Sequence, residues 1–275
     1  MISGLNFSSA FGYRAPELQS TEPVEVVADQ NYAQEVEAGL RYFRQLAARQ
    51  LELHEDLLAA VESGNLAAAK TAYVNARPPY EEIEVFAGSF EQEDSDIDAR
   101  PYAFDLGEMS PEFKGVHRIE GFIYRDNDLR AAIPYAEELV ATTRSLIAKL
   151  NDSSNFSAQS NFAGMIALAA EVPAKKISSE EETWSDQSLL IFKSNWDGIY
   201  SQYQPFAERL APEIANAVDA AYQNCLAILE PFATPNSVAM TPYSSLSTAQ
   251  RSDIIRVAYQ FLAALLEARD ALGLG

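Results

Sequence analysis

The sequence predicts an all-α protein, a helical bundle that forms one elongated unit. Apolar residues recur at helical spacing along most of the 275 residues, and no segment shows the sustained alternation of a strand. Apolar residues make up 48% of the chain, enough for a large core, and this excludes disorder for most of its length. Two halves of comparable helix content, about 30–150 and 157–272, are compatible with a duplicated bundle.

Residues 1–28 contain two prolines and have no helical period, so we expect an extended N-terminal arm before a helical domain at 29–275. In the first half of that domain we expect a helix from about Gln30 to Gly64, and a second helix from Leu66 that Arg77-Pro78-Pro79 interrupts or kinks and that resumes over Tyr80–Phe90. We then expect an acidic loop over 91–112, a helix that opens at Ser110-Pro111-Glu112 and contains His117, and a helix from Asp128 to about Leu150.

The second half begins after a polar loop at Asn151–Ser157. Here we expect a helix over Ser160–Glu171 that Val172-Pro173 closes, a helix start at Ser178–Glu182, helical structure from Trp184 to Leu229 with breaks near Pro205 and Pro212, a loop over Pro231–Pro242, and a last helix over Gln250–Leu272 with Ser247 as its cap.

Charge and residue counts exclude several classes of function. Forty acidic against 20 basic residues give a net charge of −20, so nucleic-acid binding is not expected. The longest apolar run, Phe162–Ala170, is too short to span a membrane, and the first residues do not resemble a signal peptide. Cys225 is the only cysteine, which excludes an internal disulfide and a cysteine-based metal site. With only two histidines, His54 and His117, most histidine-rich metal or triad schemes are excluded as well.

Two short patterns place metal-ligating side chains one helical turn apart. His117-Arg118-Ile119-Glu120 puts an imidazole and a carboxylate on one helix face, where both reach a single ion. Glu81 and Glu84 have the same spacing, and Glu84 adjoins the side that Ile83 marks as buried. Either pair is equally compatible with ordinary hydrogen bonds or a solvated acidic face.

Further polar and aromatic residues have a structural and a functional interpretation. Asp94, Asp96 and Asp98 alternate in the expected loop and offer hard oxygen ligands without the spacing of an EF-hand. Asn195 and Asp197 are polar positions in an apolar helix and suggest a buried network. The remaining residues of this kind are expected to be structural: His54, Trp184, Trp196, Tyr200, Tyr203 and Cys225.

Taken together, these patterns resemble the imelysin-like family, which includes the EfeO iron-uptake proteins. The resemblance runs over about 30–272 and is carried by Gly64-Asn65-Leu66, Tyr80-Glu81-x-Ile83-Glu84, Asp96-Ile97-Asp98-Ala99-Arg100, Gly115-Val116-His117-Arg118-Ile119-Glu120 and Asn195-Trp196-Asp197-Gly198. It implies two related four-helix bundles, an extracytoplasmic location and a role in iron uptake, as in members without a cupredoxin domain.

The resemblance also implies a ligand set. His117 and Glu120 match the family's HxxE motif, and Glu84 and Asp98 match its further acidic residues. With Glu81, this set suits iron first, and zinc, manganese, copper or calcium as alternatives. Arg118 is expected to orient one of these carboxylates. The implied partners are the metal ion, an inner-membrane iron permease and a peroxidase-type protein.

The sequence departs from the family at three places. Ser185–Ile191 lacks a histidine and two aspartates that family members often carry, and Asp186 is a partial substitute. Val85 replaces a proline, and Pro101-Tyr102 replaces acidic residues.

Three other functions remain open from the sequence. The first is a metal-dependent peptidase or hydrolase, for which Glu81 is the only spare carboxylate as general base. The second is a polysaccharide-binding protein with metal bridges and with Trp184 and Trp196 as contacts. The third is a helical adaptor without a ligand.

Overall fold

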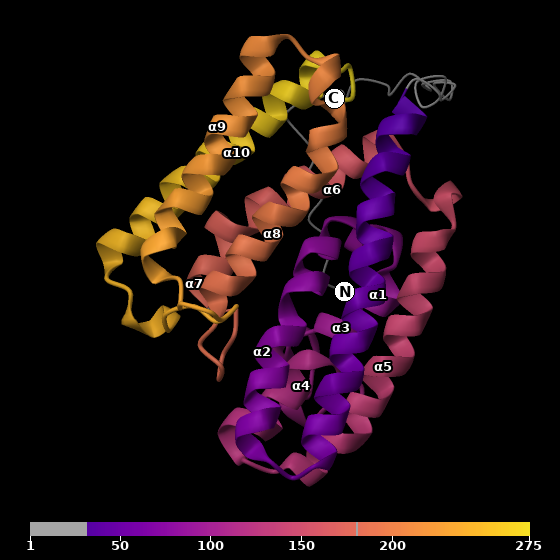
Figure 1. Cartoon of the computed structure of the whole chain (residues 1–275), viewed down its shortest axis with the longest axis vertical. Coiled ribbons are helices and arrows are strands. Elements are labelled where there is room, and N and C mark those ends of the chain that lie inside the picture. The colour runs from indigo at the N-terminus through magenta and orange to yellow at the C-terminus, as the bar shows by residue number, and fades with distance from the viewer. Residues whose placement is uncertain (1–31, 180) are drawn as a thin grey trace, which may run out of the picture.

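Figure 1 shows the computed structural model of the protein, which describes residues 32–179 and 181–275. The arm expected at 1–28 lies outside these residues. The described residues form helices joined by turns, and their one β-bridge is isolated, between Ala233 and Met240. The all-α prediction is therefore confirmed. None of the described helices is long and apolar enough to cross a membrane.

The first half of the chain is built on three long helices (Figure 1). Helix α1 (Ala33–Glu62) packs along both α2 (Leu66–Ile83) and α5 (Leu129–Asn151). Two short helices, α3 (Glu91–Asp98) and α4 (Val116–Glu120), pack against α5 and against each other. The fourth side of this bundle is thus made of short pieces, whose ends bring loop and helix residues into the interior.

The second half contains four long helices, coloured from rose to yellow in Figure 1. They are α6 (Ala158–Glu171), α8 (Ser188–Tyr203), α9 (Pro212–Leu229) and α10 (Thr248–Ala271), with the three-residue α7 (Ile177–Ser179) between α6 and α8. Helix α9 packs on α10, and α6 contacts both α8 and α10. The predicted break before Pro212 and the predicted Ser247 cap are both confirmed.

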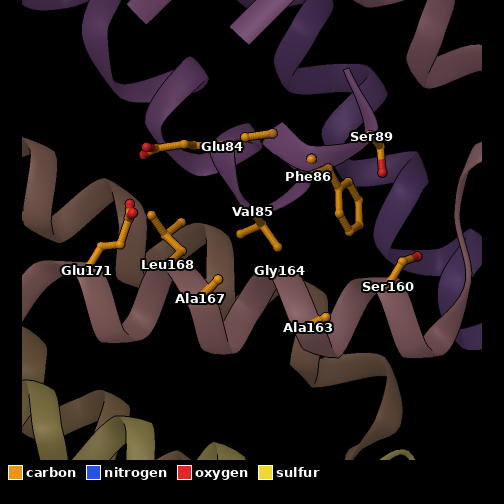
Figure 2. Close-up of a pocket in the computed structure, with 12 residues that line it drawn as sticks. Glu84, Val85, Phe86, Ser89, Ser160, Ala163, Gly164, Ala167, Leu168 and Glu171 are labelled. Atoms are coloured by element: carbon orange, nitrogen blue, oxygen red, sulfur yellow. The ribbon is translucent and has the colours of Figure 1, made fainter. Parts of the chain in front are cut away.

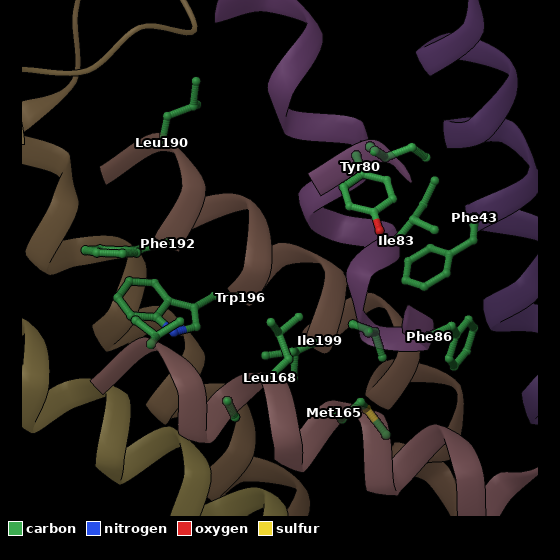
Figure 3. Packing of buried hydrophobic residues seen from close by; sticks show 14 of the residues in the cluster. Phe43, Tyr80, Ile83, Phe86, Met165, Leu168, Leu190, Phe192, Trp196 and Ile199 are labelled. Atoms are coloured by element: carbon green, nitrogen blue, oxygen red, sulfur yellow. The ribbon is translucent and has the colours of Figure 1, made fainter. Parts of the chain in front are cut away.

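One hydrophobic core runs through both halves. Figure 3 shows Phe43, Ile83 and Phe86 of the first half near Met165 and Ile199 of the second. All of these side chains are buried. Helix α8 also packs directly on α2, so side chains from the two helices meet in the interior. The aromatic residues Trp196 and Tyr203 belong to this core, as expected.

Helix α3 contradicts the acidic loop expected over 91–112. Residues Glu91–Asp98 are helical because Ile97 is fully buried and Phe90, just before the helix, is buried too. These two positions anchor one face, while Glu91 is exposed and Asp94 and Asp96 are half-buried. Only the part from Ala99 onward is irregular, with short 3₁₀ turns.

The helix start expected at Ser110-Pro111-Glu112 is also wrong. Helix α4 begins at Val116, and Gly115 stands at its N-cap position with φ 78°. A β-carbon on Gly115 would lie 2.2 Å from the backbone oxygen of Ile97. The start of α4 is therefore pressed against the end of α3, an approach that only glycine permits.

The proline pair does not interrupt the second helix. Helix α2 continues through Pro78 and Pro79 to Ile83, because its inward face is held by the fully buried Tyr80 and its neighbours. Where a helix start was expected at Ser178–Glu182, Ser178 and Ser179 belong to the three-residue α7, residues 181–187 are not helical, and α8 begins at Ser188. Two successive peptide N–H groups in this segment donate to Glu120, a bond pattern that replaces the helical one.

Candidate metal centre

The five predicted ligands lie in one buried cluster at the junction of four short stretches of chain. Glu81 and Glu84 come from the end of α2 and the turn after it, Asp98 ends α3, and His117 and Glu120 belong to α4. Glu81, Asp98, His117 and Glu120 are at most 6% exposed. The side chain of Glu84 is 12% exposed. Residues that are up to 39 positions apart in the sequence thus share one interior.

His117 lies between two carboxylates. Its Nε2 atom is 3.3 Å from Oδ1 of Asp98, and its Nδ1 atom is 3.5 Å from Oε2 of Glu120. The second contact confirms that positions three apart on α4 face the same side. The Nε2 atom makes no hydrogen bond of good geometry, although it is buried. When the imidazole is neutral, its Nε2 atom and the Asp98 oxygen beside it are two ligand atoms that a single cation can take.

The other oxygen of Glu120 has a structural role. Oε1 accepts hydrogen bonds from the backbone N–H groups of Trp184 at 2.9 Å and Ser185 at 2.7 Å. Glu120 therefore connects α4 to the turns that precede α8. The HxxE glutamate both faces His117 and holds a segment of the second half in place.

Arg77 contacts three acids of the cluster through its guanidinium group. Its Nη2 atom contacts Glu81 and lies 3.0 Å from Oδ1 of Asp98, and its Nε atom is 2.7 Å from Oε1 of Glu182. Tyr73 donates a hydrogen bond to the other oxygen of Glu182 at 2.8 Å. Arg77 is 1% exposed, so its charge is neutralised almost entirely by these carboxylates.

Two further cations complete the ion pairs. Arg100 lies 3.3 Å from Oδ2 of Asp98 and also pairs with Glu181. The ammonium of Lys176 is 2.7 Å and 3.0 Å from the two oxygens of Glu84. The described residues of the cluster then include six carboxylates, on Glu81, Glu84, Asp98, Glu120, Glu181 and Glu182. They also include three permanent cations, Arg77, Arg100 and Lys176. Among the described residues, these acids exceed the permanent cations by three formal charges, and protons, on Glu81 and His117 first, or a bound cation must offset the excess.

Asn195 brings the second half into contact with the predicted ligands. Its amide nitrogen donates to the backbone oxygen of Glu81 at 2.8 Å and to Oε2 of Glu84 at 2.9 Å. One turn later, a β-carbon on Gly198 would lie 2.2 Å from the backbone oxygen of Glu82. Glycine at this position lets α8 approach α2 closely enough for the amide of Asn195 to reach the acids.

The ionisation of the cluster follows from its contacts. Burial opposes the charge on Asp98, but Arg100 and Arg77 outweigh it and hold the pKa of Asp98 well below its ordinary value. Burial and Arg100 oppose a charge on His117, but Asp98 and Glu120 prevail and raise the pKa of His117. Burial raises the pKa of Glu81 to about 8, with Arg77 opposing this shift. The acids thus differ in how readily they hold a proton.

Two π-helical turns flank the cluster. Gly121–Asp126 follows Glu120 directly, and Val172–Lys176 ends at the cationic residue. Wide turns of this kind are rare and are frequent at functional sites. The first follows Glu120 and the second ends at Lys176, and both of these side chains belong to the cluster.

The donor types fit a hard or borderline cation, since the cluster offers carboxylate oxygens and one imidazole. Among the described residues, no three acid, histidine or cysteine side chains already surround one point as ligands. The three cations stand between the carboxylates instead. A metal that enters must therefore displace or move part of these ion pairs.

Among the five candidate ligands, Glu84 is the most exposed. A groove of about 420 Å³ lies between the turn Glu84–Ser89 and helix α6. Figure 2 shows Glu84 and Glu171 at the same end of this groove, with Val85 and Leu168 along it. Glu84 is thus the candidate ligand that lines an opening to the surface.

Several residues from the sequence analysis lie elsewhere. Asp94 accepts a hydrogen bond from Tyr80, and Asp96 pairs with Lys114 at 3.2 Å. Asp186 accepts from the backbone of Ser244 at 2.8 Å. These contacts give the three aspartates partners of their own.

The role expected for Arg118 is wrong. Its guanidinium stacks over Phe122 at 4.8 Å and donates to the backbone oxygen of Glu108 at 2.8 Å, so it orients no ligand. His54 is buried and hydrogen-bonded to Thr143 at 2.7 Å, as the structural interpretation expected. Arg125 lies 4.8 Å over the ring of Trp184.

Sequence reasoning missed the cations and two of the acids. Arg77 precedes Glu81 by one helical turn, a spacing that favours an ion pair, and this signal was available. Lys176 and Glu182 gave no such signal, because their main partners, Glu84 and Arg77, lie 92 and 105 positions away in the chain. Only the polar character of Asn195 within an apolar helix pointed to the buried network.

Comparison with known proteins identifies the family of this chain. The family model described as Imelysin (Peptidase_M75) matches residues 41–269, which is most of the chain. The chain belongs to the imelysin family. The match spans both halves, so the imelysin unit includes the whole cluster, from Arg77 to Asn195.

Among curated relatives, this imelysin-family chain is similar to proteins named iron uptake system component EfeO. It is 30% identical over 218 residues to the one from Escherichia coli (strain K12), covering 78% of this chain and 57% of that protein. The figures for Yersinia pseudotuberculosis serotype I (strain IP32953) are 30% identity, 78% and 58%. The one from Shigella boydii serotype 4 (strain Sb227) is 31% identical, with 70% and 52% covered. The chain thus spans little more than half the length of these relatives.

Proposed function

We propose that this chain is a metal-binding component of an iron-uptake system, with an iron-like di- or trivalent cation as its cargo. The ion is held by His117, Glu120 and Asp98, with Glu84 and Glu81 as further ligands. The observation that carries the proposal is the excess of three carboxylates over permanent cations, among the described residues, in a buried cluster where His117 lies between Asp98 and Glu120. Such an interior favours a cation strongly, because the acids are poorly solvated.

The resemblance to EfeO proteins supports iron as the cargo and an extracytoplasmic location. On this proposal, an inner-membrane permease receives the ion, and a peroxidase-type protein acts with it. The donor set itself also accommodates manganese and zinc. The order of affinities among these ions is therefore part of the test.

The test is a calorimetric titration of the metal-stripped protein with Fe(II), Fe(III), Mn(II), Zn(II), Cu(II) and Ca(II). His117→Gln is the sharpest variant, because its side chain makes no backbone hydrogen bond. Glu137→Ala is the control, an exposed acid on α5 outside the cluster. We expect one tightly bound iron ion per wild-type chain and a loss of affinity of at least about 10-fold in His117→Gln, as for the loss of a metal ligand.

The double variant His117→Ala/Glu120→Ala should abolish binding. Thermal unfolding checks that each variant is folded, since Glu120 also holds backbone groups. Equal affinities in His117→Gln and Glu137→Ala would overturn the proposed ligand set. Absence of binding of every ion to the wild type would overturn the proposed function.

A further inference from the structure

The ammonium of Lys176 stands where a cation would be expected among three acids. It lies 2.7 Å and 3.0 Å from the oxygens of Glu84, 3.7 Å from Oε2 of Glu81 and 3.8 Å from Oε1 of Glu181. Lys176 is 4% exposed. A lysine is seldom buried to this degree, and here the three carboxylates stabilise its charge.

Asn195, whose amide nitrogen donates to Glu84 and Glu81, adds an oxygen of the type that ligates cations. Its Oδ1 atom is buried and accepts no hydrogen bond from the described residues. Carboxylate and amide oxygens are the ligands that hard cations take in proteins. The acids around Lys176 are therefore arranged for a cation, and at present the protein's own ammonium supplies the charge.

The local backbone directs this lysine inward. Lys176 is the last residue of the π-helical turn Val172–Lys176, whereas its neighbour Lys175 is exposed and pairs with Glu171 at 3.2 Å. The wide turn shifts the register of the chain after α6, which points the Lys176 side chain toward α2. The groove of Figure 2 is lined at one end by Glu84, the main partner of the ammonium.

We propose that Lys176 is a tethered counter-ion that the metal must displace, and that this exchange sets the affinity of the site. The inference rests on the proposed function and names the residue that limits the affinity of the site for metal. Without metal, the ammonium keeps Glu81, Glu84 and Glu181 paired. When a multivalent ion enters, the ammonium moves out and its three acids become available to the metal. A monovalent ion gains nothing, because it replaces one positive charge with another.

The experiment compares Lys176→Gln with the wild type by Mn(II) and Fe(II) calorimetry and by thermal unfolding with and without metal. Lys175→Gln is the matched control, one position away on the exposed side. We expect Lys176→Gln to bind metal at least about 10-fold more tightly, because no ammonium competes. Its metal-free form should melt at a lower temperature than the wild type, and saturating Mn(II) should raise its melting temperature more than it raises that of the wild type.

Two further variants keep the test decisive. Lys176→Arg retains a cation and should show no gain in affinity. Lys176→Gln/Glu84→Gln removes one charge of each sign and should also lose the gain. If Lys176→Gln folds only when Mn(II) is present, the inference is supported; if it fails to fold even with Mn(II), the inference is overturned.

The outcomes separate this inference from the proposed function. If the wild type binds metal through His117 and Lys176→Gln binds no more tightly, the tethered counter-ion is overturned and the metal site stands. If Lys176→Gln binds tightly while His117→Gln matches the wild type, the counter-ion stands and the His117 ligand set is overturned. If no variant binds any metal, both are overturned.

Discussion

The Glu120 carboxylate accepts a hydrogen bond from the backbone N–H of Ser185, 65 positions later in the chain, at 2.7 Å. This bond joins the HxxE helix to the turns before α8. Glu120, a residue of the predicted metal motif, therefore also connects the two halves of the chain. The effect of substituting it must be measured on the stability of the protein as well as on metal binding.

Removal of the Glu120 carboxylate should destabilise the protein. Glu120→Ala leaves the N–H groups of the half-buried Trp184 and Ser185 without their acceptor and His117 without one of its two carboxylates, so we expect a loss of about 3–5 kcal/mol in the free energy of unfolding. Glu120→Gln keeps an acceptor oxygen and should lose roughly half as much. Urea denaturation measures both, with Glu137→Ala expected within about 0.5 kcal/mol of the wild type. Equal losses in the alanine and glutamine variants would contradict the role of Oε1.

Among the cations of the cluster, Arg77 should be the one whose substitution lowers the stability of the protein most. Arg77→Met leaves Glu81, Asp98 and Glu182 without their shared partner in the interior, so we expect a loss of about 3–5 kcal/mol or failure to fold. Arg49→Met is the control, since Arg49 is 56% exposed and pairs with Glu52 on the surface; its loss should be below about 1 kcal/mol. Similar losses in the two variants would show that the buried network adds no stability.

The buried His54 should make the protein less stable in acid. Burial, together with Arg77, lowers the pKa of His54 to about 3, so in the folded state it stays neutral where the unfolded chain takes up a proton. Stability should therefore fall as the pH drops below about 6.5 and continue to fall toward pH 3, by about 1.4 kcal/mol per pH unit.

His54→Gln removes this titration and keeps a hydrogen-bonding group near Thr143. The free energy of unfolding of the wild type relative to that of His54→Gln should thus decrease between pH 6.5 and pH 4. Chemical denaturation at several pH values measures the difference. A difference that is constant with pH would mean that His54 is protonated in the folded protein.

The close contact of α8 with α2 should not tolerate a larger residue. A β-carbon on Gly198 meets the backbone oxygen and α-carbon of Glu82 at 2.2 Å and 2.5 Å, so Gly198→Ala must push the helices apart. We expect a loss of about 1–3 kcal/mol or more. Gly88→Ala is the matched control, because nothing lies within 4 Å of its β-carbon. Thermal unfolding compares the two variants, and Gly198→Ala should melt at a lower temperature than Gly88→Ala.

Helical spacing and cap residues were sufficient to predict the long helices. Asp128 and Ser247 cap α5 and α10 as expected, because both caps depend on residues within one turn. The errors occur where distant contacts decide the local structure. Ile97 turns an acidic stretch into a helix by packing into the core, and Glu120 holds the residues before α8 out of helical form.

The candidate site was predicted in part for the same reason. His117 and Glu120 share a face because of their spacing, and the convergence of Glu81, Glu84 and Asp98 on them came from the family resemblance. Neither the helical spacing nor the family resemblance predicted the counter-ions. Lys176 and Glu84 are 92 positions apart, and no local pattern connects an ammonium to a carboxylate at that separation.

The cluster takes its acids and bases from both halves of the chain, and this has a consequence for fragments of the protein. A cut in the loop after Leu150 would leave Arg77, Asp98 and His117 on one piece, and Lys176, Glu182 and Asn195 on the other. Each piece alone would expose charged groups that only the other can pair. Each piece should therefore be poorly folded by itself. The two should reassociate when mixed, and recovery of metal binding should show that they have done so.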